Sequence, residues 1–141
     1  MPAYYRKISK YKYQLTRDYS VKTPITGYLL GNKYVQLDPD GLLTIHEGYA
    51  WDGPSGPTID TDNFMRGSLV HDALYQLMRM GLIPQECRVV ADRLLRDICL
   101  EDGMSDFRAG YVYEAVREFA ANDAKPHEHD EFDDKEYQTR G

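Results

Sequence analysis

One histidine, one tyrosine and two aspartates of the sequence are spaced so that they can act together. His71 and Asp72 are adjacent, and Tyr75 follows His71 by four residues, so a helix would place all three on one broad face. Asp92 follows His71 by twenty-one residues, with Gly81 about midway between them. If the chain reverses at Gly81 into an antiparallel helix, Asp92 reaches the level of His71. A carboxylate there can hold the imidazole in one tautomer, as a general base requires.

A segment rich in glycine and proline precedes this helix. Two prolines and two glycines within residues 53–57 exclude a helix or a central strand and indicate an irregular loop over Trp51–Pro57. Asp72 points about 100° away from His71 on a helix, and we expect it to meet this loop. Carboxylates of Asp72 and Asp52, with carbonyl oxygens of the loop, are the donors that Ca²⁺ prefers. A cation held there would polarise an ester carbonyl while His71 deprotonates the attacking water.

Each of these side chains also has an ordinary structural role open to it. His71 could be a partly buried histidine that is satisfied by a neighbour, and Tyr75 could simply belong to the core. Asp92 could be a surface acid between Arg88 and Arg96, which stand four residues to either side of it. The conjunction of spacings favours a functional site over these separate roles.

Two alternatives to an ester hydrolase follow from the same residues. In the first, His71, Asp72 and Asp92 form a buried polar network that fixes the helix pair of a non-enzymatic module. In the second, zinc bound by Asp52, His71, Asp72 or Asp92 serves a peptidoglycan or peptide hydrolase. The second has less support, because a catalytic zinc generally takes three ligands rich in histidine and one well-placed histidine is visible here.

The elements that must position these residues follow an α+β order. The first 50 or so residues alternate in polarity, are rich in tyrosine and threonine, and carry strong turn signals, which indicates a small antiparallel β-meander. We expect a strand over Tyr11–Tyr19, a hairpin of Tyr28–Leu30 and Lys33–Leu37 that turns at Gly31-Asn32, a turn at Asp38–Gly41, and a strand over Leu42–His46.

Three helices follow the glycine- and proline-rich loop. The first is predicted from about Phe64 to Met80, where Gly81 ends it, and the second from Pro84 to just before Gly103. The third is capped by Ser105 and runs to about Ala121. We therefore expect one domain over residues 1–121. Residues 122–141 hold seven acidic residues against three basic ones and are expected to form a disordered tail.

Composition and charge narrow the function classes. The chain has 141 residues, 42% of them hydrophobic, which suits a folded domain, and its formal net charge of −6 does not favour nucleic acid as a partner. No run of eighteen apolar residues predicts a membrane span, and the N-terminal residues do not resemble a secretory signal. Cys87 and Cys99 are too far apart on the second helix to bridge, and we expect synthesis in a reducing cytoplasm.

The chain resembles an uncharacterised family of phage and prophage proteins, known as a domain of unknown function. The resemblance covers residues 10–120 or so. The matching motifs are Asp52-Gly53-x-Ser55-x-Pro57, Val70-His71-Asp72-x-Leu74-Tyr75, Ala91-Asp92-Arg93, and the third-helix residues Tyr113, Ala115, Val116, Arg117 and Phe119. It implies a phage or prophage origin, synthesis in the host bacterial cytoplasm, possible association with the virion, and other virion proteins as partners.

About 45 residues of the same block are similar to the core of calcium-dependent secreted-type phospholipases. By this resemblance His71 is the general base, Asp92 its partner, Tyr75 a supporting tyrosine and Asp72 a calcium ligand. Asp52, Gly53 and Ser55 belong to the loop that would hold the ion. The chain departs from that family because it lacks cysteines around the histidine and has fewer loop glycines. The implied function is metal-assisted hydrolysis of phospholipid esters at a membrane, in a virion or a lysis system.

Overall fold

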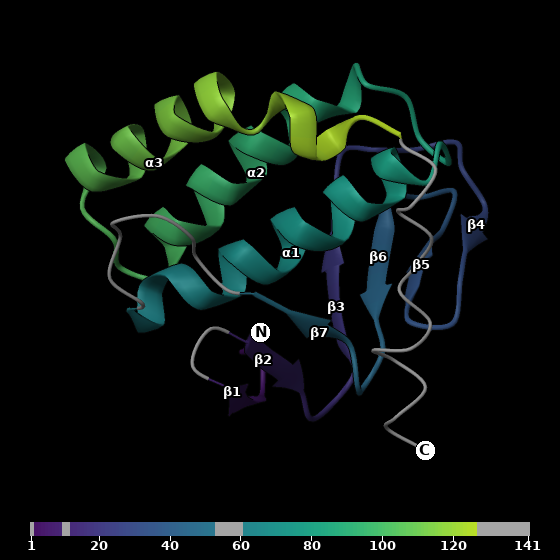
Figure 1. Ribbon diagram of the computed structural model, residues 1–141, viewed down its shortest axis with the longest axis horizontal. Helices are drawn as coiled ribbons and strands as arrows, with labels where there is room; N and C mark the ends of the chain where they lie inside the picture. Colours follow the sequence, from purple (N-terminus) through teal and green to yellow (C-terminus); the bar gives the residue numbers. More distant parts are fainter. Residues whose placement is uncertain (1, 10–11, 53–60, 127–141) are drawn as a thin grey trace. The chain divides into compact units, whose positions relative to one another are not determined.

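The computed structural model describes residues 2–9, 12–52 and 61–126 (Figure 1). The described chain divides into two compact units, one within Met1–Gly53 and one within Pro54–Asp130. The first unit contains antiparallel strands and the second contains three helices. The predicted α+β class is therefore confirmed.

The N-terminal strands form two small antiparallel sheets. One sheet has the order β1-β2-β7, and the other has the order β3-β6-β5-β4. The strands are β1 (Tyr5–Ser9), β2 (Lys12–Leu15), β3 (Tyr19–Lys22), β4 (Leu30–Gly31), β5 (Val35–Leu37), β6 (Leu42–Ile45) and β7 (Ala50–Trp51). β3 pairs with β6 and not with β4, the strand that follows it along the chain. The strands of this sheet therefore do not follow a simple up-and-down order.

The stretch predicted as one strand over residues 11–19 is divided between β2 and β3. The chain bends after Leu15, and Asp18 anchors the bend. The Asp18 carboxylate accepts a hydrogen bond from the Glu47 backbone N–H at 2.7 Å and lies 3.3 Å from His46 Nδ1. These contacts lower the pKa of Asp18, chiefly through the backbone bond. A long-range contact of this kind cannot be seen in a local alternation pattern.

The turn predicted at Gly31-Asn32 is displaced by one residue. Gly31 pairs with Gln36 inside the β4–β5 ladder, so the connection runs over residues 32–34. The Asn32 side chain accepts hydrogen bonds from the backbone N–H groups of Tyr34 and Val35, at 2.9 and 3.0 Å, which closes this turn. The turn predicted at Asp38–Gly41 is confirmed by the bond from Gly41 N to Asp38 O.

The helical unit contains α1 (Asp62–Arg79), α2 (Cys87–Glu101), α3 (Asp106–Phe119) and the short 3-10 helix η1 (Ala121–Ala124). Gly81 and Gly103, both at positive φ, end α1 and α2 with the two backbone bonds of a Schellman motif. Ser105 caps α3 by accepting from Arg108 N, as predicted. The second helix begins at Cys87 rather than Pro84, because the residues between them form a turn closed by Cys87 N and Pro84 O.

Side-chain contacts show that consecutive helices are antiparallel. Near the start of α1, Arg66 contacts Asp102 at the end of α2. Farther along α1, Tyr75 contacts Arg88 at the start of α2. Between α2 and α3, Arg88 contacts the Val116 carbonyl, whereas Arg96 lies over the Tyr113 ring. The predicted antiparallel helix pair is therefore confirmed, and α3 extends it to three helices (Figure 1).

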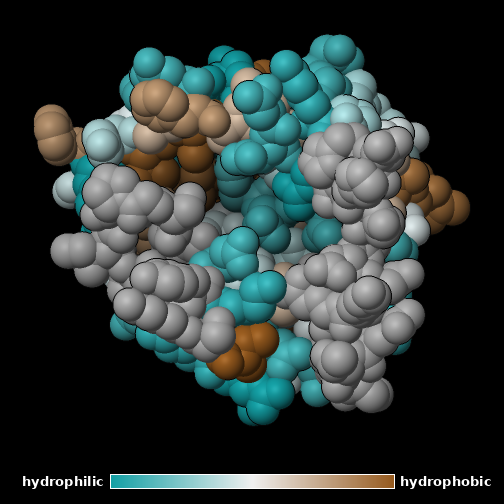
Figure 2. Space-filling view, in the orientation of Figure 1, coloured by the Kyte–Doolittle hydropathy of each residue, from teal (hydrophilic) through white to brown (hydrophobic). Residues whose placement is uncertain are grey.

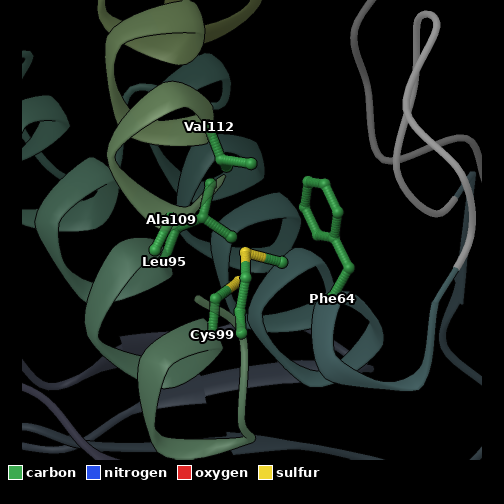
Figure 3. Packing of buried hydrophobic residues seen from close by; sticks show 6 residues of the cluster. Phe64, Leu95, Cys99, Ala109 and Val112 are labelled. Atoms are coloured by element: carbon green, nitrogen blue, oxygen red, sulfur yellow. The ribbon is translucent and has the colours of Figure 1, made fainter. Parts of the chain in front are cut away.

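A hydrophobic cluster joins the three helices at one end of the bundle. Figure 3 shows Phe64 of α1, Leu95 and Cys99 of α2, and Ala109 and Val112 of α3 turned toward one another, and Met104 completes the buried set. Burial raises the pKa of the Cys99 thiol to about 12, so this cysteine is a packing residue rather than a nucleophile.

The ordered helical unit extends past the predicted end of the domain. Instead of a tail beginning at Asn122, η1 follows α3 and contacts α1. Arg79 donates to the Asp123 carbonyl at 2.9 Å and Gln85 to the Ala124 carbonyl at 2.6 Å, and Ala124 is buried. Composition alone did not reveal these backbone contacts. The predicted disorder of residues 127–141 lies outside the described residues.

The sequence predicts no membrane-spanning helix. Among the helices that the structure describes, none combines the length and apolar character needed to cross a bilayer.

The close approach of α1 and α2 depends on Gly67, and a glycine-to-alanine pair tests this. A Cβ atom at Gly67 would lie 3.0 Å from both Cys99 Sγ and Leu95 Cδ1 and 3.3 Å from the Leu95 carbonyl. We expect Gly67→Ala to lower the free energy of unfolding by about 1–2 kcal/mol, because overpacking outweighs the helix propensity of alanine. Urea denaturation gives the measurement.

Gly110→Ala is the matched control, since a Cβ there meets nothing within 4 Å. It should stabilise the protein by about 0.5–1 kcal/mol through helix propensity alone. Equal stabilisation by both substitutions would show that α1 and α2 do not pack as closely as described.

Candidate functional site

His71 and Asp92 form the pair that the helical register predicts. His71 lies in the middle of α1 and Asp92 on the facing side of α2, and His71 Nε2 is 2.7 Å from Asp92 Oδ1. The reversal at Gly81 brings the two residues level, so the pairing predicted from sequence is confirmed.

Tyr75 joins the same carboxylate oxygen from one turn farther along α1. Its hydroxyl donates to Asp92 Oδ1 at 2.6 Å, and its ring centroid lies 4.1 Å from that of His71. Burial, supported by the negative charge of Asp92, raises the pKa of Tyr75 far above its usual range. Tyr75 therefore remains a hydrogen-bond donor to Asp92 across the physiological range.

Two arginines complete the surroundings of Asp92. Arg117 of α3 donates from Nη1 to Asp92 Oδ2 at 2.8 Å, and Arg88 Nη1 lies 3.5 Å from the same oxygen. Arg88 also donates to the carbonyl oxygens of Val116 and Arg117 at the end of α3. Side chains from all three helices thus converge on one carboxylate.

These partners keep Asp92 ionised although its side chain is 0% exposed. Burial by itself would raise the pKa of Asp92, but hydrogen bonds from His71, Tyr75 and Arg117 outweigh it and lower the pKa below its ordinary value. An ionised carboxylate only accepts hydrogen bonds. Its two oxygens therefore accept from His71 and Tyr75 on one side and from Arg117 on the other.

The ionised carboxylate determines which imidazole nitrogen of His71 carries the proton. Because Asp92 Oδ1 must accept, Nε2 donates, and in the tautomer that this bond selects the lone pair is on Nδ1. Within the described residues, Nδ1 of His71 has no hydrogen-bond partner. The His71 side chain is 14% exposed, so solvent reaches part of this side chain.

The predicted calcium ligands are not brought together by the described residues. Asp72 is half-buried on α1 and has contacts of its own. Asp52 is exposed after β7 in the other unit, with Lys12 Nζ 3.8 Å away. Gly53 and Ser55 lie outside the described residues. Across the described ranges, no group of three or more histidine, cysteine, aspartate or glutamate side chains could hold one metal ion. The calcium site stays a prediction.

The sequence predicts three members of the network, and it names the two arginines without a role in it. Arg88 was visible only as an i, i+4 neighbour of Asp92. Arg117 could have been found by the reasoning that was applied at Gly81: a second reversal, at Gly103, brings the last turn of α3 near the level of Asp92. The apolar pattern of the third helix gave no such indication.

Exposed apolar side chains of the described helical unit are concentrated on α3. Phe107 is 87% and Phe119 is 76% exposed, and Tyr111 shares a side of the helix with Phe107. Figure 2 shows that apolar groups on the displayed face are separated by hydrophilic surface. No large exposed hydrophobic residue lies on α1, the helix of His71, within its described residues.

Comparison with known proteins gives no relative for this chain: no family model, curated protein or solved structure matches it.

The ionisation of Asp92 predicts how stability varies with pH. The folded state holds the pKa of Asp92 below that of the unfolded chain, so its stabilising contribution is present above about pH 4 and is lost as the pH falls through the folded-state pKa. We expect Asp92→Asn to cost about 3 kcal/mol at pH 7, because it leaves two arginines facing a neutral amide. The cost should shrink toward pH 3. Urea denaturation over this range measures it.

Asp97→Asn provides the control, because Asp97 is exposed on the same helix and contacts only Arg96, at 3.6 Å, among the described residues. This variant should change stability by less than about 0.5 kcal/mol. A loss in Asp92→Asn that is constant from pH 7 to pH 3 would contradict an ionised Asp92.

Proposed function

We propose that the helical unit is the core of an ester hydrolase in which His71 is the general base. The observation that carries this proposal is the orientation of the imidazole: Nε2 is bonded to a buried, ionised carboxylate at 2.7 Å, and Nδ1 has no partner within the described chain. A neutral imidazole held in this way has its basic nitrogen available for a substrate or a water molecule.

The proposed reaction uses His71 twice. A water molecule hydrogen-bonded to Nδ1 gives its proton to the imidazole as its oxygen attacks the carbonyl carbon of the ester. Asp92 stabilises the imidazolium that forms, because its Oδ1 already accepts from Nε2. When the tetrahedral intermediate collapses, Nδ1 returns the proton to the departing alcohol oxygen, and the products are a carboxylic acid and an alcohol.

The substrate class rests on the resemblance to calcium-dependent phospholipases. It supports a phospholipid ester as the substrate and a membrane as the partner, in a phage virion or lysis system. In this proposal Asp72 of the helical unit would be a ligand of Ca²⁺, and the ion would supply a positive charge for the developing oxyanion. The bonds of Asp92 weigh against its use as a zinc ligand, because both of its oxygens accept from protein donors.

A non-enzymatic virion module is the second candidate, and one observation favours it. Asp92 is fully buried and is bonded to side chains of α1 and α3, so the network also fixes the three-helix arrangement. In that case the orientation of His71 is a consequence of packing and has no chemical use.

Hydrolysis by the wild type and by His71→Gln separates the two candidates. The full chain is incubated with phosphatidylglycerol vesicles and Ca²⁺, and released fatty acid is measured. We expect activity in the wild type and a loss of about 10²–10⁴-fold in His71→Gln, because the base is removed. His46→Gln, which changes a histidine of the strand unit, should retain the wild-type rate. Absence of hydrolysis in the wild type, with His71→Gln less stable, would favour the structural module.

Calorimetry tests the calcium part of the proposal independently of turnover. Titration of the wild type with CaCl₂ should show binding at about 10⁻⁵–10⁻³ M, the range of a modest site, and should raise the melting temperature by mass action. Asp72→Asn should abolish the heat, whereas Asp97→Asn should leave it unchanged. The same heat in Asp72→Asn and the wild type would exclude Asp72 as a ligand.

A further inference from the structure

The phospholipase resemblance locates the site on two helices, but a side chain of a third helix also holds its central carboxylate. Asp92 Oδ1 accepts from His71 and Tyr75, both on α1. Asp92 Oδ2 accepts from Arg117, which α3 supplies from its last turn. A carboxylate is planar, so fixing Oδ2 also fixes the direction in which Oδ1 points.

Arg88 does not duplicate the bond made by Arg117. Its Nη1 lies 3.5 Å from Asp92 Oδ2, which is an ion-pair distance rather than a directed hydrogen bond. Its donors are directed elsewhere: Nη1 to the Val116 carbonyl at 3.2 Å and to the Tyr75 hydroxyl at 3.4 Å, and Nη2 to the Arg117 carbonyl at 3.3 Å. Arg88 therefore balances the charge of Asp92 and holds the end of α3. Among the described residues, Arg117 makes the one hydrogen bond to Asp92 Oδ2, from Nη1 at 2.8 Å.

The two arginines form a reciprocal link between α2 and α3. Arg88 of α2 donates to main-chain carbonyls of α3, and Arg117 of α3 donates to a side chain of α2. The same end of α3 leads into η1, which Arg79 and Gln85 hold through backbone carbonyls. Arg117 therefore reaches Asp92 from the end of α3, where hydrogen bonds from Arg88, Arg79 and Gln85 hold the backbone of α3 and η1.

We propose that Arg117 is a positioning residue for His71: by holding Asp92 Oδ2, it keeps Oδ1 aligned with His71 Nε2 and so directs Nδ1. Its importance for catalysis rests on the proposed function, whereas the positioning itself does not. The effect of Arg117 is on orientation more than on charge, since Arg88 remains as a counter-charge to Asp92 when Arg117 is replaced. The Arg117 side chain is 30% exposed, so its replacement leaves a site that water can enter.

The tautomer of His71 is the readout that a purely structural role would not change. Long-range ¹H–¹⁵N spectra of the ¹⁵N-labelled full chain distinguish a proton on Nε2 from one on Nδ1, and His71→Gln identifies the signal. We expect the wild type to hold the Nε2–H form. In Arg117→Gln the share of the Nδ1–H form should rise about tenfold, as expected for the loss of one charge-assisted hydrogen bond.

Two further variants make this experiment specific. Arg117→Lys keeps the charge but loses the planar fork of donors, and it should fall between the wild type and Arg117→Gln. Arg96→Gln also removes an arginine from the α2–α3 contact, where Arg96 lies over the Tyr113 ring, but does not touch Asp92. It should retain the wild-type tautomer.

The outcomes separate this inference from the proposed function. A wild-type tautomer in Arg117→Gln overturns the positioning role, whatever the hydrolytic activity. A shifted tautomer in a protein that never hydrolyses an ester supports the positioning role and removes the proposed function. If Arg117→Gln does not fold, Arg117→Lys decides: a raised share of the Nδ1–H form supports the inference, and a spectrum identical to that of the wild type overturns it.

Discussion

The helical unit depends on one buried negative charge. Removing a carboxylate from water costs several kcal/mol unless charged partners and hydrogen bonds replace the solvent. Asp92 meets this condition with His71, Tyr75 and Arg117 within hydrogen-bond distance and Arg88 as a second cation. Because these groups stand on three helices, the charge is satisfied only when α1, α2 and α3 are all in place. The packing of the three helices and the burial of the Asp92 charge therefore depend on each other.

The packing that satisfies Asp92 is set by features at the ends and crossings of the helices. Gly81 and Gly103 reverse the chain through Schellman motifs, and Ser105 starts α3 at a defined residue. Gly67 lets α1 approach Leu95 and Cys99 closely. At the other end of the bundle, Arg66 of α1 pairs with Glu101 and Asp102. These local features give the register that places His71 opposite Asp92, so the geometry of the site depends on how the helices end as well as on the site residues themselves.

Much of this arrangement could be predicted because it depends on short-range signals. Gly81 ends α1 and Ser105 caps α3. Because His71 and Asp92 are about equally far from Gly81 along the chain, a reversal there predicts that they pair. The failures involve contacts between distant residues. Asp18 breaks a strand through Glu47, and Arg79 holds η1 through Asp123, neither of which leaves a periodic trace in the sequence. Arg117 belongs to the same class, because its bond to Asp92 depends on two successive helix reversals.

The position of one proton tests the central claim most directly, namely that an ionised Asp92 accepts a hydrogen bond from Nε2 of His71. A neutron structure of the deuterium-exchanged protein at neutral pH would locate it. The account predicts deuterium on His71 Nε2, directed at Asp92 Oδ1, with none on Nδ1 and none on the carboxylate. Deuterium on Nδ1 with Nε2 bare, or on an oxygen of Asp92, would contradict the account. So would His71 and Asp92 side chains more than about 6 Å apart with no bridging water, because no hydrogen bond spans that distance.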